Sequence, residues 1–244
     1  MTVLDLWLVR HGESLANIAA SVAEAAGADV VEAPARDADV ELSDIGMQQA
    51  DALGIWLGSI PKPDLPTLAL SSTYRRAEQT LLRAQAAGGL TIPSGVDERL
   101  RDRELGVLDL LTFTGVANRF PEEAKRKLWL GKFYYRPPGG ESWADVALRV
   151  RSFLGDLDSR ETSGPVLIVA HDAVVMLFIY VCLGMREREL LDFASANTVL
   201  NASVTKLRRT ADGWTLDVFS SAEHLRDLGA PVTEHAGDPV VHPR

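Results

Sequence analysis

The sequence predicts an α/β fold, a three-layer α/β/α sandwich in which a mostly parallel central sheet lies between two layers of helices. Short apolar runs alternate with segments of helical pattern, which is typical of parallel sheets covered on both faces. We expect strands at 3–9, 68–71 and 165–170, and a closing hairpin of 199–207 and 214–219. With 244 residues, 46% of them hydrophobic, the chain can bury the core of one domain.

Five helices are expected, and serine precedes most of them. A serine hydroxyl at this position accepts a hydrogen bond from a free N–H group of the first helical turn. The first expected helix begins at Leu15 after Ser14, and the second spans 44–57 after Ser43. The third follows the serines at 71–72 and carries Arg75 and Arg76 in its first turn. The last two run from 141–142 to about 157 and over 173–183. Apolar residues recur at helical spacing in these segments.

Three segments have a weaker pattern. The stretch 19–39 is rich in small and acidic residues, and this composition is compatible with either a helix or a mobile segment. The stretch 113–135 carries aromatic and basic side chains, either as a lid over a site or as a helical excursion that packs its aromatic rings. Turn signals without a core pattern start near residue 230, so we expect a domain at 1–229 and a C-terminal tail at 230–244.

The motif Arg10-His11-Gly12 directly follows the first predicted strand. A strand that ends there holds a cation and an imidazole at its C-terminal edge, where open α/β sheets bind ligands. Glycine allows close approach of the backbone, and a helix capped by Ser14 presents free N–H groups and a partial positive charge. These features suit a phosphate group, although an ordinary strand–turn–helix with a surface histidine has the same local pattern.

Two other strand ends offer similar side chains. His171 and Asp172 follow the apolar run 165–170 and precede a long apolar segment, which indicates a buried strand, a histidine at its end and a buried helix. The strand at 68–71 leads to the arginine pair of the third predicted helix. Histidines and arginines from distant parts of the chain are therefore expected at one edge of the sheet.

These motifs resemble those of the histidine phosphatase superfamily, the phosphoglycerate mutase-like proteins. Its signature is Arg-His-Gly near the N-terminus, a Ser-x-x-x-Arg-Ala-x-Gln-Thr segment and a second histidine after a late apolar strand. All three occur here in order, at 10–12, 72–80 and 171. The resemblance extends from about residue 6 to about residue 219, and it implies a phosphoglycerate mutase-like fold.

Two segments, 138–142 and 166–175, look most like the fructose-2,6-bisphosphatase domain of the bifunctional enzyme. Gly139 stands where that domain carries a sugar-binding lysine, and Asp172 stands where it carries glutamine. Because of these differences, the substrate of that enzyme is not carried over to this chain.

The side chains at the strand ends suit phosphoryl transfer. A histidine attacks phosphorus only through a neutral ring nitrogen, and His11 is the candidate nucleophile. Guanidinium groups and N–H donors neutralise the phosphoryl oxygens in such reactions. The candidate phosphate-binding residues are Arg10, Ser14, Asn17, Arg76 and His171, with Asn17 implied by the resemblance.

A leaving alkoxide needs a proton, so an acid with a raised pKa is expected close to these residues. The loop 97–106 is dense in carboxylates. The resemblance implies Asp102, two residues beyond Arg-Leu, at a position where the family usually carries glutamate. Glu104 is the fallback acid, and a solvated loop of ion pairs is the alternative for the whole segment.

A cysteine nucleophile and a metal site are both disfavoured. Cys182 and Arg188 match the Cys-x5-Arg spacing of cysteine-dependent phosphatases, but Cys182 lies in an apolar helix rather than in a loop of free N–H groups. A buried structural cysteine is expected instead. The histidines at 224, 235 and 242 lack metal-ligand spacing, so no metal or other cofactor is expected.

Composition limits the partners and the compartment. The net charge of −9 argues against nucleic acid or an anionic membrane as the main partner, so a phosphate site must be a local positive pocket. A single cysteine excludes an internal disulfide and, with no secretion signal recognised, fits the cytoplasm. The sequence leaves the natural substrate and the oligomeric state open, and a homo-oligomer is one of the possible states.

The sequence thus predicts a metal-independent phosphomonoesterase that hydrolyses a small phosphorylated metabolite through a phosphohistidine and releases phosphate. A phosphoglycerate-type mutase is the first alternative, because it shares the intermediate and returns the phosphoryl group to a second hydroxyl. A phosphate-binding module without turnover is the second alternative, and aspartate at position 102 is its only support.

Overall fold

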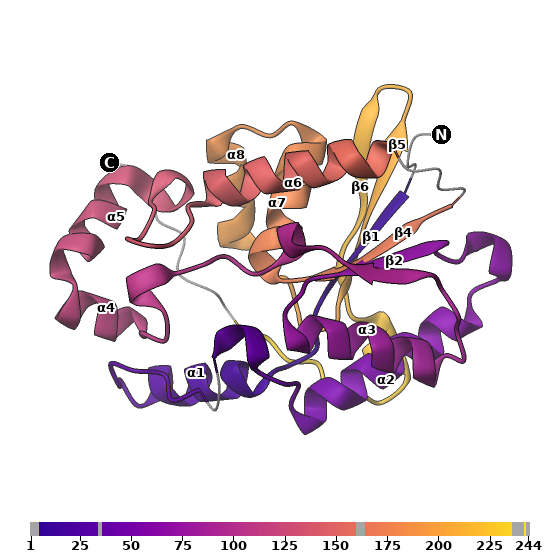
Figure 1. Cartoon of the computed structure of the whole chain (residues 1–244), viewed down its shortest axis with the longest axis horizontal. Helices are drawn as coiled ribbons and strands as arrows, with labels where there is room; N and C mark the ends of the chain where they lie inside the picture. The colour runs from indigo at the N-terminus through magenta and orange to yellow at the C-terminus, as the bar shows by residue number, and fades with distance from the viewer. Residues whose placement is uncertain (1–4, 34–35, 160–163, 236–241, 243–244) are drawn as a thin grey trace.

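A computed structural model of the chain describes residues 5–33, 36–159, 164–235 and 242. At its centre is a six-stranded sheet with the order β3-β2-β4-β1-β5-β6 (Figure 1). The strands are β1 (Asp5–Arg10), β2 (Leu68–Ser71), β3 (Ser94–Val96), β4 (Val166–Ala170), β5 (Val204–Thr210) and β6 (Gly213–Ser221). The first four are parallel, whereas β5 and β6 form an antiparallel hairpin at one edge. The predicted mostly parallel sheet is confirmed.

Helices cover both faces of the sheet, which confirms the three-layer arrangement (Figure 1). One layer contains α6 (Trp143–Asp158), α7 (Asp172–Leu183) and α8 (Glu187–Ala196). The other contains α1 (Leu15–Ala25), α2 (Asp44–Ser59), α3 (Arg75–Ala87) and the short α9 (Glu223–Asp227). Two further helices, α4 (Phe113–Arg119) and α5 (Pro121–Tyr134), lie to one side of these layers.

The strand side chains alternate between the two layers, because successive residues of a strand point to opposite faces. Leu6 and Leu8 of β1 belong to the core formed with α6 and α7. Trp7 and Val9 belong to the core formed with α2 and α3. Burial on both faces explains why the parallel strands have nearly continuous apolar sequences.

The pairing of β1 with β4 brings two distant motifs together. Arg10 lies opposite Ala170 in the register, and the backbone N–H of His11 donates to the Ala170 carbonyl at 2.9 Å. His11 and His171 therefore leave adjacent parallel strands at the same edge. Ser72 follows β2, which pairs with β4 on its other side.

The helix after β2 differs from the prediction. Tyr74 occupies the N-cap of α3 and makes no side-chain capping bond, so the prediction of a serine-capped helix was wrong. Ser72 accepts from the Tyr74 N–H at 3.1 Å in the turn before the helix, and its hydroxyl lies 2.9 Å from His171 Nε2. The predicted serine caps do occur on three other helices, at Ser14, Ser43 and Ser142.

The irregular segments acquire partial structure. The stretch 19–39 continues α1 to Ala25 and ends in a 3-10 turn at Asp37–Asp39, while residues 34–35 lie outside the described residues. The stretch 113–135 forms α4 and α5. It buries Phe133 and Tyr135 but leaves Trp129 74% exposed, so only some of its aromatic rings are packed.

Residues 230–235, the first part of the expected tail, bond to the rest of the chain. The Gln49 side-chain amide donates to the Pro231 carbonyl at 2.9 Å and to Thr233 Oγ1 at 2.8 Å. The Asn201 N–H donates to the Thr233 carbonyl at 3.2 Å. Of the remaining expected tail, only residue 242 is described. The His235 carbonyl also accepts a bond of 3.1 Å from Arg10 Nη1, which places the backbone at 235 beside the end of β1.

Candidate active site

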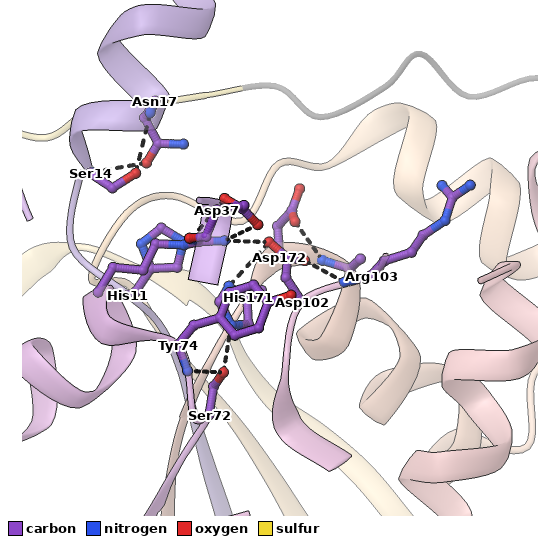
Figure 2. Close-up of polar contacts among 12 residues, drawn as sticks. His11, Ser14, Asn17, Asp37, Ser72, Tyr74, Asp102, Arg103, His171 and Asp172 are labelled. Carbon is purple, nitrogen blue, oxygen red and sulfur yellow. Dashed lines mark hydrogen bonds and ion pairs between the residues drawn. The ribbon is translucent and has the colours of Figure 1, made fainter. Parts of the chain in front are cut away.

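Two histidine rings lie side by side at the C-terminal edge of the sheet (Figure 2). The ring centroids of His11 and His171 are 5.1 Å apart in an edge-to-face arrangement. Both residues are buried. The parallel pairing of β1 and β4 accounts for this contact, because each ring belongs to the first residue after its strand.

His11 has an unprotonated Nε2. Its Nδ1 lies 2.7 Å from the Gly12 carbonyl oxygen, and because a carbonyl only accepts, Nδ1 carries the hydrogen. Nε2 in turn accepts from Arg76 Nε at 3.2 Å. Burial, followed by neighbouring positive charges led by Arg76, holds the pKa of His11 well below its usual value. The ring is therefore neutral at pH 7, as nucleophilic attack requires.

Gly12 allows the loop after β1 to pack against the start of α2. A Cβ atom at this position would lie 2.6 Å from the Gly46 carbonyl oxygen, which is closer than such atoms approach. The Gly12 N–H donates to Thr80 Oγ1 at 3.1 Å. The glycine thus serves the packing of backbone on backbone that orients His11.

Arg10 is buried next to His11 and has an unused donor. Its Nη1 donates to the Val199 carbonyl at 2.6 Å and to the His235 carbonyl at 3.1 Å. Within the described part of the chain, its buried Nε has no hydrogen-bond partner. An unpaired buried donor is costly, and an anion in the cavity would satisfy it.

Arg76 is held by two carboxylates. Its Nη2 donates to Asp102 Oδ2 at 3.0 Å, and its Nη1 and Nη2 donate to the Asp37 carboxylate at 3.0 and 3.2 Å. The Asp37 backbone carbonyl accepts a further bond of 2.7 Å from Nη1. Asp37 is not among the residues predicted from the sequence, because it lies in the irregular 19–39 stretch.

Asp102 links Arg76 to His171. Its Oδ2 lies 3.2 Å from His171 Nδ1, and its Oδ1 accepts from the Arg103 N–H at 2.8 Å. The Ser72 hydroxyl already accepts from Tyr74, so its own hydrogen is available to His171 Nε2. This leaves the hydrogen of the neutral His171 ring on Nδ1. Within the described residues this buried N–H lies next to the Asp102 carboxylate but completes no hydrogen bond, so it is available to a phosphoryl oxygen.

The pKa of Asp102 differs from the expectation. Burial alone would raise it, but His171 and Arg76 together hold the pKa of Asp102 well below its usual range. Burial lowers the pKa of His171, and the nearby Asp102 charge opposes that effect. The expected raised pKa of the acid is therefore wrong for this structure, because the two neighbours stabilise the carboxylate.

Glu104 is directed elsewhere. Its Oε1 accepts from the Tyr74 hydroxyl at 2.8 Å, and its backbone N–H donates to Glu141 Oε2 at 3.2 Å. Of the two candidate acids, Asp102 lines the cavity at the histidines and Glu104 does not.

Ser14 and Asn17 form the capping box of α1. Ser14 Oγ accepts from the Asn17 N–H at 3.2 Å, and Asn17 Oδ1 accepts from the Ser14 N–H at 3.1 Å (Figure 2). Asn201 Nδ2 lies 3.4 Å from the same Asn17 oxygen. Ser14 and Asn17 both line the cavity, so the capping box of α1 forms part of its wall.

The cavity that contains these residues has a volume of about 530 Å³. It includes four of the five candidate phosphate-binding residues. The fifth, His171, is fully buried and contacts Asp102 of the lining. Its charged lining residues are Arg10, Glu24, Asp37, Arg76, Asp102, Arg103, Asp109, Lys132 and Asp172. His235 also lines it, although the sequence placed this residue in a tail.

Cys182 is poorly suited to act as a nucleophile. Cys182 lies in α7, and burial raises the pKa of its thiol to about 12, which disfavours a reactive thiolate. The described residues include no group of three or more histidine, cysteine or carboxylate side chains placed to hold a metal ion. No helix in the described ranges is long and apolar enough to span a membrane.

We expect His11 to stay neutral at pH values where an ordinary histidine is half protonated. The reason is its burial among cations, which lowers its folded-state pKa below 6.5. In 15N-histidine NMR, the His11 ring should keep the signals of a neutral Nδ1–H tautomer at pH 6, with the His11→Gln variant providing the assignment. The acid limb of kcat/KM should likewise fall well below pH 6.5. Protonation of His11 near pH 6.5 would contradict this geometry.

Known proteins of similar sequence carry out phosphate chemistry. The metal-independent phosphoserine phosphatase of Arabidopsis thaliana is 27% identical over 228 residues, 93% of this chain and 85% of that protein. The 6-phosphofructo-2-kinase/fructose-2,6-bisphosphatase of Aquarana catesbeiana is 28% identical over 190 residues. That match covers 78% of this chain but only 35% of the bifunctional enzyme.

A third relative has a solved structure. The glucosyl-3-phosphoglycerate phosphatase of Mycobacterium tuberculosis is 30% identical over 203 residues, 77% of this chain and 86% of the relative. The structure of the mycobacterial enzyme with inorganic phosphate superposes with a TM-score of 0.69 at 28% identity, covering 91% of this chain and 99% of the other.

The family comparison covers all six strands except Asp5, and all the cavity-lining residues except His235. The family model "Histidine phosphatase superfamily (branch 1)" matches residues 6–221. Together with the paired histidines at the ends of β1 and β4, this match shows that the chain belongs to the histidine phosphatase superfamily.

Proposed function

We propose that this chain is a phosphomonoesterase that hydrolyses a small phosphorylated metabolite through a phosphohistidine at His11. The observation that carries the proposal is the neutral His11 ring, whose Nδ1 hydrogen is held by the Gly12 carbonyl and whose Nε2 lone pair is free of a proton. The phosphatase relatives support the same reaction class.

In the first step, Nε2 of His11 attacks phosphorus and the bond from phosphorus to the alcohol oxygen breaks. Arg76 exchanges its bond to Nε2 for one to a phosphoryl oxygen, and Arg10 offers its unpaired Nε to another. Oriented guanidinium groups in a buried site neutralise charge without reorganisation of solvent. His171 adds the Nδ1–H donor on the Asp102 side.

Asp102 supplies the proton to the departing oxygen. A bound phosphoryl dianion shares Arg76 and His171 with the carboxylate, so it weakens the interactions that keep the pKa of Asp102 low and favours its protonated form. After the alcohol leaves, the Asp102 carboxylate takes a proton from water, and the hydroxide oxygen displaces His11 from phosphorus. Asp102 takes up one proton from solvent when the phosphoryl dianion binds, and it releases that proton when inorganic phosphate leaves. The free enzyme, with Asp102 ionised, is thereby restored.

A phosphate-release screen tests this proposal. Sugar phosphates, phosphoglycerates, phosphoserine, nucleotides and phosphopeptides are assayed, each with and without EDTA. We expect release from at least one small phosphomonoester and an equal rate after dialysis against EDTA, because the two arginines and His171 provide the charge neutralisation that Mg²⁺ gives other enzymes. Activity that EDTA abolishes and Mg²⁺ restores would contradict the proposed site.

The same screen separates the alternatives. A phosphoglycerate-type mutase would interconvert phosphoglycerates much faster than it releases phosphate from them. A phosphate-binding module would retain a phosphate ligand and release nothing from any compound. We place the reaction in the cytoplasm as part of this proposal, supported by the single cysteine, which cannot form an internal disulfide.

Removing the Asp37 charge is expected to tighten the binding of inorganic phosphate by about fivefold. The Asp37 carboxylate occupies two Arg76 donors that a phosphoryl group would use. A like charge a few ångströms from an anion costs on the order of 1 kcal/mol even at the dielectric constant of water. The inhibition constant of phosphate is measured for Asp37→Asn. The control is Asp39→Asn, which alters a surface ion pair with Arg36 in the same turn. Weaker phosphate binding in Asp37→Asn would instead assign this residue to orienting Arg76.

A further inference from the structure

A second, smaller cavity adjoins the active site. This compartment is lined by α4, α5 and the loop 103–111. Its volume is about 140 Å³, and most of its lining side chains are apolar. A cavity of similar size, about 150 Å³, can hold a benzene molecule when its walls are apolar. Leu108, Val116, Ala124 and Leu128 belong to this compartment alone.

The two cavities share part of their lining. Arg103, Leu105, Leu111 and Phe113 contribute to both. Two of the apolar lining residues are unusually exposed, since Phe113 is 57% and Leu128 is 42% accessible to solvent. Apolar side chains at the opening of a cavity lose this exposure when an apolar ligand covers them, which favours binding.

The compartment adjoins the loop of Asp102, the residue proposed to protonate the leaving group. Displacement at phosphorus is in line, so the alcohol oxygen leaves opposite His11 and toward the acid that protonates it. The loop that continues from Asp102 supplies the shared residues Arg103 and Leu105. In Figure 2 the Arg103 side chain extends away from the two histidines, and its Nε donates to the Glu141 carbonyl at 2.8 Å.

We propose that this compartment binds the apolar part of the substrate alcohol, so that the enzyme prefers phosphomonoesters carrying an alkyl or aryl group of about six carbons. The inference rests on the proposed phosphomonoesterase activity and specifies its substrate class. The phosphoryl group binds between Arg10 and Arg76, and the hydrocarbon extends past Leu105 into the space between α4 and α5.

A series of straight-chain alkyl phosphates tests the preference. Ethyl, butyl, hexyl and octyl phosphate have leaving alkoxides of nearly equal basicity, so differences in kcat/KM report contacts of the chain. Burial of one methylene contributes about 0.8 kcal/mol, which is roughly fourfold in kcat/KM. We expect a rise on the order of 100-fold from ethyl to hexyl phosphate and a levelling for octyl phosphate. A flat or falling series overturns the inference.

Ala124→Phe fills the compartment from α5. In this variant the kcat/KM for hexyl phosphate should exceed that for ethyl phosphate by no more than about threefold. The matched control is Thr114→Phe on α4, at an exposed position outside both cavities, and it should keep the ratio of the original enzyme. A ratio that survives in Ala124→Phe overturns the inference.

A second variant guards against a folding defect in Ala124→Phe. Val116→Ala enlarges the compartment and should move the preferred chain length from hexyl to octyl phosphate. An unchanged optimum in this variant overturns the inference. Failure of the original enzyme to release phosphate from ethyl phosphate and every compound of the screen would contradict the phosphomonoesterase activity itself, a result distinct from a flat alkyl series.

Discussion

Replacement of His11 by alanine is expected to abolish the covalent phosphoryl-enzyme and to lower kcat by at least about four orders of magnitude. The reason is geometric, because the Nε2 lone pair of His11 faces the Arg76 guanidinium and no second histidine has the same arrangement in the described part of the chain. Rapid-quench labelling with a radiolabelled substrate should yield an acid-labile, base-stable adduct in the original enzyme and none in His11→Ala.

The matched control is His242→Ala, which removes a half-exposed histidine that lies 3.6 Å from Asp192, away from the cavity. It should keep full labelling and full turnover. Equal labelling of His11→Ala and the original enzyme would exclude His11 as the nucleophile. Loss of turnover with retained labelling would assign His11 to the hydrolysis step alone.

Asp102→Asn is expected to slow the hydrolysis of alkyl phosphates by about two to four orders of magnitude, the usual contribution of general acid catalysis. Aryl phosphates with acidic leaving groups should lose much less in the burst that forms phosphohistidine, since they scarcely need a proton. Asparagine keeps the shape of the side chain that contacts Arg76 and His171. The selectivity between substrate classes therefore separates proton donation from positioning.

The burst and the steady state must be measured separately, because Asp102 is also proposed to activate water in the second step. Glu104→Gln is the matched control, since Glu104 bonds to the Tyr74 hydroxyl rather than lining the cavity. Equal burst losses for both substrate classes in Asp102→Asn would indicate a structural role. A selective loss for alkyl phosphates in Glu104→Gln would assign the acid to that residue.

The strands that form the site were predictable because they are buried on both faces. Continuous apolar sequences mark β1, β2 and β4, and serine caps mark the starts of α1, α2 and α6. The strand β3 has no such mark, since Ser94, Gly95 and Val96 are exposed and are held as a strand only by pairing with β2. The helix α8 buries Leu190 and Leu191 after an arginine N-cap, and the helix-forming composition of 187–196 was a signal that could have revealed it.

Two residues of the site had no local signal. Asp37 reaches Arg76 from an irregular turn, and His235 lines the cavity from a segment with no core pattern. Both positions depend on contacts with residues far away in the sequence, such as the bonds of Gln49 to Pro231 and Thr233. Periodicity and capping report local structure, so they carry no information on such contacts.

The sequence by itself determined which strands end in histidine or arginine, and hence that these side chains lie at one edge of the sheet, because burial and helix capping act over a few neighbouring residues. Only the tertiary structure decided that β1 lies next to β4, that His11 carries its hydrogen on Nδ1, and that Asp37 occupies Arg76. It also decided that the pKa of Asp102 is lowered rather than raised. Protonation states follow from the distances between charges and from burial, and the fold sets both by bringing together residues that are distant in the chain.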